Sequence, residues 1–131
     1  MRNLMIKPTT IGLFLSFLTI QSFANDQSSP GAGERSPGDM TLEERQAMME
    51  SASKYDNCVY SQAMTSIGDY QDIRHVADYA LGECSEKLVD LEQLITGWGM
   101  PEPYAKSFSN RIRQRATRKL LPELAIRKAG G

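Results

Sequence analysis

Apolar residues recur at helical spacing along most of the chain after residue 40. The first stripe predicts one face of a helix that ends near Ser66, where Gly68 follows as a stop signal. Thr41 and Glu44 have the S/T-x-x-E spacing of a capping box, so ordered structure should begin at Thr41. The stripe consists of Met48, Ala52, Tyr55, Val59, Ala63 and Ile67.

A second and clearer stripe predicts another helix, which starts with Asp69 or Asp72 as its N-cap and stops at Gly97. Gly82 lies inside this helix and weakens it by roughly 1 kcal/mol relative to Ala, so a local bend is plausible there. The stripe consists of Ile73, Val76, Ala77, Ala80, Cys84, Leu88, Leu91 and Ile95.

Residues 97–103 read GWGMPEP, a breaker cluster that separates a third helix beginning at about Tyr104. Pro122 should kink or end this helix, because its ring clashes with the carbonyl of Arg118. The apolar arc contains Ala105, Phe108, Ile112, Ala116 and Leu120. We therefore expect an all-α domain in which two long antiparallel helices form a hairpin and a third helix lies across their apolar faces.

The first 24 residues resemble a targeting segment rather than part of the fold. Arg2 and Lys7 precede the apolar run at 11–20, and residues 22–24 form a small-x-small ending, which together predict a signal peptide cleaved near Ala24. An uncleaved anchor is disfavoured, because residues 9–24 fall short of the roughly 20 apolar residues that a span requires. Residues 25–40 are polar and rich in Gly and Pro, which predicts a flexible linker before a helical domain at 41–131.

Export changes the interpretation of Cys58 and Cys84. An oxidising compartment favours a structural disulfide, and the two residues fall at similar heights on the predicted hairpin. A zinc site would need further ligands, and His75 is the only histidine. We favour an ordinary exposed histidine there, although Asp72 and Asp78 flank it at helical spacing.

Charge is distributed unevenly along the chain. Residues 26–102 contain 15 acidic and 5 basic residues, whereas residues 103–131 contain 1 acidic and 8 basic residues. Four of the basic residues share one arc of the third helix: Arg111, Arg115, Arg118 and Lys119. We favour pairing of this arc with the acidic helices, and the alternatives are an anionic membrane surface, another polyanion or an acidic protein partner. Export and the net negative charge of the mature chain disfavour nucleic acid.

No catalytic motif, phosphate-binding loop or metal-ligand pattern is apparent, so we expect no enzyme and no cofactor. Trp98 either closes the end of the bundle, which we favour, or anchors an interface. The expected function is a non-catalytic protein-binding factor of the periplasm or extracellular space, of the inhibitor, immunity or assembly type. The alternative is a membrane-surface or polyanion binder that acts through residues 104–121.

Overall fold

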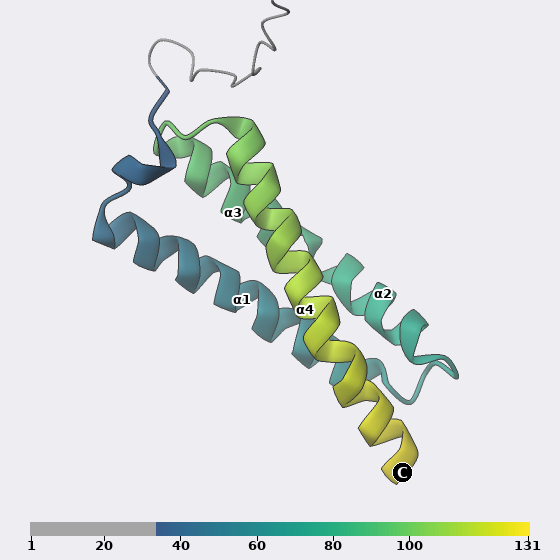
Figure 1. Cartoon of the computed structure of the whole chain (residues 1–131). Coiled ribbons are helices and arrows are strands. Elements are labelled where there is room, and N and C mark those ends of the chain that lie inside the picture. The colour runs from purple at the N-terminus through teal and green to yellow at the C-terminus, as the bar shows by residue number, and fades with distance from the viewer. Residues whose placement is uncertain (1–33) are drawn as a thin grey trace, which may run out of the picture.

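The computed structural model describes residues 34–131, and the regular structure in this range is entirely helical. A short 3-10 helix, η1 (Pro37–Asp39), precedes α1 (Leu42–Ser66), α2 (Ile73–Glu83), α3 (Ser85–Gly97) and α4 (Glu102–Gly130) (Figure 1). The all-α fold is confirmed. The predicted signal peptide and most of the predicted linker lie outside the described residues.

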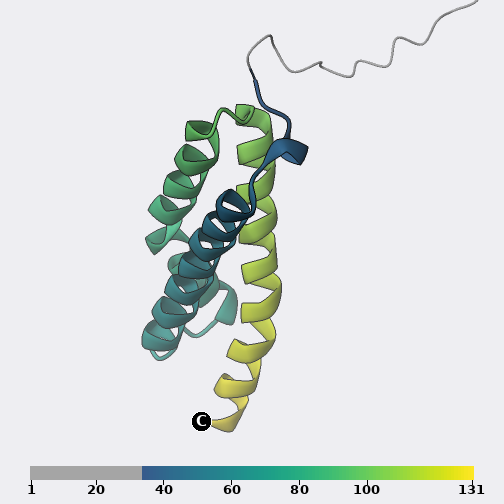
Figure 2. The ribbon, with the colours of Figure 1, turned by 90° about the vertical axis from the view of Figure 1, so that its left-hand side faces the viewer.

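The helices α1 and α4 run in the same direction, whereas α2 and α3 follow one another in the opposite direction (Figure 1). Viewed from the side, α1 lies in front of the seam between α4 and the α2–α3 pair (Figure 2). Both α1 and α4 pack against α2 and α3 as well as against each other. The predicted antiparallel hairpin is therefore present, with α4 laid along it.

The start of α1 follows from its capping box. The Thr41 hydroxyl accepts a hydrogen bond from the Glu44 backbone N–H at 3.1 Å, and the Glu44 carboxylate accepts one from the Thr41 N–H at 2.9 Å. These bonds satisfy two groups that a helix start would otherwise leave unpaired. The predicted stripe faces the core from Met48 to Ala63, and the helix ends at Ser66 as expected.

The second predicted helix is divided in two at Cys84. This residue has φ −97° and ψ 4°, so α2 ends at Glu83 and α3 begins at Ser85. The interruption falls two residues beyond Gly82. A Cβ added at Gly82 would meet no atom within 4 Å. The domain therefore has four α-helices within residues 34–131. Periodicity alone does not reveal the backbone break, because the apolar stripe continues through it.

The helix α4 continues past Pro122 and reaches Gly130. Leu124, two residues beyond the proline, is 0% exposed and belongs to the core. Burying such a side chain contributes about 1.5–3 kcal/mol, which offsets much of the roughly 3 kcal/mol that a proline inside a helix costs. Core packing therefore holds this part of the chain in the helix.

Candidate functional site

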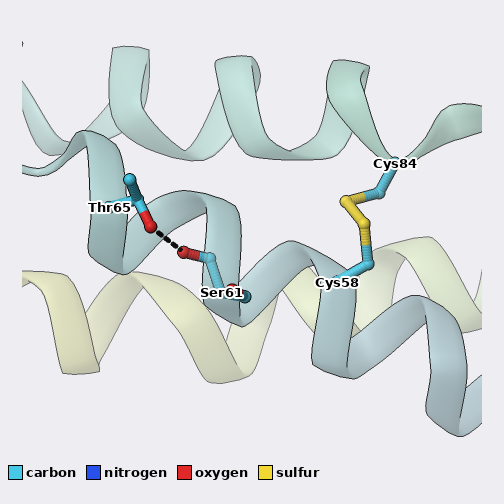
Figure 3. Close-up of a disulfide and its surroundings, with 4 residues drawn as sticks. All are labelled: Cys58, Ser61, Thr65 and Cys84. Atoms are coloured by element: carbon cyan, nitrogen blue, oxygen red, sulfur yellow. Dashed lines mark hydrogen bonds between the residues drawn. A yellow bond between two sulfur atoms is a disulfide. The ribbon is translucent and has the colours of Figure 1, made fainter.

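Cys58 on α1 and Cys84 at the α2–α3 junction form a disulfide with a Cα–Cα distance of 6.0 Å (Figure 3). Cys84 is 1% exposed, and the described residues contain no free cysteine. The predicted bridge is confirmed. Its buried position, which ties the middle of α1 to the helix junction, indicates a structural role.

Arg35 fastens the chain ahead of α1 to the loop between α3 and α4. Its backbone N–H donates to the Gly99 carbonyl at 2.9 Å, and its guanidinium donates to the Glu44 carboxylate at 2.7 Å and to the Trp98 carbonyl at 2.9 Å. Gly99 has a φ of 82°, which favours glycine. The last residues of the segment expected to be a linker are thus docked, and nearby Met40 is 5% exposed.

The contact with Arg35 also affects the pKa of Glu44. Its pKa is lowered, first by the hydrogen bond from Arg35 and then by the bond from the Thr41 backbone N–H. The pKa of Arg35 is raised by the same pair. The polar sequence around Arg35 has no periodicity, so pattern analysis had no signal for this contact.

Trp98 lies in the loop between α3 and α4 and is half-buried against the core. Its backbone carbonyl accepts the bond from Arg35, which adds a second restraint on the loop. This placement is that of a side chain that closes the end of the bundle.

The four basic residues singled out on α4 fall into two pairs. Arg115 and Lys119 approach the same oxygen of Asp56 on α1, at 3.2 and 3.9 Å. Arg111 and Arg118 are exposed, and no carboxylate in residues 34–131 lies within 4.0 Å of either side chain. The Arg111 guanidinium instead lies 5.8 Å from the Phe108 ring centroid on the same helix. Pairing within the domain therefore accounts for two of the four basic residues of the arc.

A surface groove of about 520 Å³, which we call the α1–α4 groove, lies between these two helices. Its floor is apolar and consists of Val59, Ala116 and Leu120, all buried. Its rim carries side chains of both charges: Asp56, Asn57 and Tyr60 from α1, and Arg118, Lys119 and Glu123 from α4. The sequence carries no signal for the groove, because the groove depends on α1 and α4 lying side by side in parallel, which periodicity within each helix does not specify.

Two buried polar groups beside the groove have no hydrogen-bond partner: Asp56 Oδ1 and Arg115 Nε. The Asp56–Arg115 contact is therefore made through one carboxylate oxygen rather than as a two-bond pair. Such a contact is weaker and less directional than a bidentate one. The Asp56–Arg115 contact links the two helices but leaves one acceptor and one donor without a hydrogen bond.

The other titratable candidates do not converge on a site. His75 is exposed, and the Asp72 carboxylate caps α2 by accepting from the Arg74 backbone N–H at 2.8 Å. Tyr55 is 0% exposed, and this burial raises the pKa of its phenol, so the side chain stays neutral in the core. Among residues 34–131, no group of three or more His, Cys, Asp or Glu side chains is arranged to hold a metal.

The geometry thus defines a small disulfide-bonded helical domain with a basic surface and an adjoining groove. No protein-family model, curated protein or solved structure matches the chain. Within the described range, no helix is long and apolar enough to cross a membrane.

Proposed function

We propose that this chain is an exported, non-catalytic binding protein that docks an acidic protein partner on the outer surface of α4. The observation that supports this proposal is the charge pairing of α4. In residues 34–131, Asp56 is the only carboxylate from another helix within 4.0 Å of a basic side chain of α4. Lys106 pairs with Glu102 inside α4 itself, and Arg111 and Arg118 face solvent.

The acidic helices do not neutralise this surface. Glu83, Glu86 and Asp90 are exposed and lie within 4.0 Å of no basic side chain in residues 34–131. Glu92 on α3 does contact α4, but it accepts a hydrogen bond from the Ser109 hydroxyl rather than pairing with a cation. The uneven charge of the sequence is therefore kept as surface charge. Complementary charge of this kind accelerates encounter with a partner and selects against partners of the wrong sign.

Export is the second part of the proposal. The leader at residues 1–24 has the three regions of a signal peptide, and a buried disulfide is typical of oxidising compartments. A binding factor in the periplasm or outside the cell would use the bridge to keep α1 in a fixed position against the α2–α3 junction, on which α4 packs.

The test compares two charge-reversal variants of the mature chain. Arg111→Glu with Arg118→Glu alters the proposed surface, and Lys54→Glu with Lys87→Glu makes the same change in net charge elsewhere. We expect the wild-type and control proteins to capture the same acidic partner from the native envelope fraction, with release at high salt. Loss of capture with the α4 variant supports the proposal. Equal capture by both variants contradicts it.

A second candidate is binding to an anionic membrane surface, which one observation favours. Ile126 is 68% exposed beside Arg127 and Lys128 in the final turns of α4, which extend past the other helices (Figures 1 and 2). Sedimentation with vesicles of anionic lipid, using the same two variants, separates this candidate from a protein partner.

A further inference from the structure

The α1–α4 groove combines an apolar floor with a charged rim that includes Arg118 and Lys119. Val59, Ala116 and Leu120 are each at most 5% exposed as residues, yet they line a cavity of about 520 Å³ that opens to the surface. This volume is within the range of sites that bind small ligands or single side chains. Tyr60, which is 42% exposed, supplies an aromatic wall.

Contacts between α1 and α4 are made on both sides of this hollow. Asp56 meets Arg115 and Lys119 towards one end, and the Tyr60 hydroxyl accepts a hydrogen bond from Arg127 at 3.1 Å towards the other. Ala116 leaves space between them because its side chain is a single methyl group. The groove is thus held open by the cross-helix contacts rather than by a flexible segment.

Pro122 adds a feature that an ordinary helix lacks. It lines the groove together with Arg118, and because proline has no backbone N–H, the Arg118 carbonyl has no donor at the usual helical position. The proline ring itself occupies the place that a helical donor to this carbonyl would take.

The charges around the groove favour an anionic occupant. Arg118 and Lys119 stand on the rim and Arg127 at one end, whereas Glu123 is the carboxylate that lines the groove without an ion pair among the described residues. Asp56, the other carboxylate, already contacts Arg115 and Lys119. The lining carries two cations and two carboxylates, and the neighbouring Arg115 and Arg127 make the surroundings of the opening positive.

We propose that the α1–α4 groove binds an aromatic or branched aliphatic side chain that projects from an acidic segment of the partner protein. This inference rests on the proposed function and specifies the partner's chemistry. The apolar side chain packs on Val59, Ala116 and Leu120. Carboxylates on either side of it pair with Arg118 and Arg127, neither of which has a carboxylate within 4.0 Å among residues 34–131. Anchors of this kind, seated in a pocket and ringed by polar contacts, provide most of the energy in many interfaces.

The probe is the capped peptide Asp-Glu-Phe-Glu-Asp, titrated into the isotope-labelled mature chain with its disulfide intact and followed by amide NMR shifts. One comparison peptide replaces Phe with Ala, and another replaces the four acidic residues with Lys. We expect the Phe peptide to shift the signals of Asn57, Tyr60 and Lys119. We also expect it to bind at least about tenfold more tightly than the Ala peptide, and the Lys peptide to cause no shifts.

Asn57→Trp tests the groove itself, because position 57 is exposed on the rim and a large ring there fills the opening without removing a cation. Ser53→Trp is the matched control, since Ser53 is an exposed residue one turn earlier on α1 that does not line the groove. We expect Asn57→Trp to weaken binding of the Phe peptide by at least about tenfold, and Ser53→Trp to leave it unchanged. Circular dichroism confirms that both variants are folded.

The outcomes separate this inference from the proposed function. Equal affinity for the Phe and Ala peptides, with shifts confined to Arg111 and Arg118, overturns the groove inference and leaves the acidic partner in place. Full binding by Asn57→Trp also overturns it. If neither peptide shifts any signal and anionic vesicles shift those of α4, both proposals are wrong and the ligand is a lipid surface.

Discussion

Removal of the disulfide between Cys58 and Cys84 should be the most damaging small change to this domain. The bridge joins residues separated by 26 positions and ties α1 to the α2–α3 junction. In the chain-entropy model, closing a loop of that length in the unfolded state stabilises the fold by about 3.5 kcal/mol. Small domains have a total stability of only about 5–15 kcal/mol, so this is a large share.

The expected shift in melting temperature follows from the size of the domain. For a domain of 60–100 residues, each 1 kcal/mol changes Tm by roughly 4–8 °C, so loss of the bridge should lower Tm by roughly 14–28 °C. Cys84 is 1% exposed, and replacing it with alanine removes little packing volume. The double variant Cys58→Ala with Cys84→Ala therefore reports mainly the lost constraint.

The assay is thermal unfolding followed by circular dichroism, with and without a thiol reductant. Reduced wild-type protein and the oxidised double variant should melt at similar temperatures, both well below the oxidised wild-type protein. The reductant should not affect the double variant, which controls for non-specific effects. A melting curve of the wild-type protein that is unchanged by complete reduction would refute the reasoning.

Three further predictions concern Glu44, Pro122 and Trp98. Because Arg35 lowers the pKa of Glu44 in the folded state, the stability from this contact is present above the ordinary pKa of 4.5 and is lost as the pH falls through the lowered value. In urea unfolding, the free energy of unfolding should fall with decreasing pH in this range. The fall should be smaller in Glu44→Gln than in the wild type, and unchanged in Glu43→Gln. Pro122→Ala should stabilise the domain by up to about 3 kcal/mol in urea unfolding, and no gain would show that α4 frays beyond this point. Acrylamide should quench Trp98 fluorescence only in part, and more strongly in Arg35→Ala; full quenching of the wild type would contradict the docked loop.

Each predicted helix depends on signals that lie close together in the sequence. The Thr41–Glu44 capping box spans one helical turn, and successive residues of the stripe from Met48 to Ala63 are three or four positions apart, so the boundaries of α1 were predictable. The disulfide was also predictable, because the chain has two cysteines and the predicted hairpin places them at similar heights.

Features that depend on distant segments were harder to predict. The division of the second helix at Cys84 leaves the apolar stripe intact, so the pattern shows no interruption. The docking of Arg35 on Glu44 and on the Trp98 carbonyl joins positions 9 and 63 residues apart, in a polar segment without periodicity. Such contacts become visible only once the helices are packed.

The basic arc on α4 shows the same division most clearly. The sequence alone determined that Arg111, Arg115, Arg118 and Lys119 share one side of a helix, because the helical repeat places them there. The tertiary structure decided which of them are neutralised, because only Arg115 and Lys119 lie beside Asp56 on the parallel helix α1. Helical periodicity is a local property of the backbone, whereas pairing and the groove depend on how side chains on separate helices are brought together.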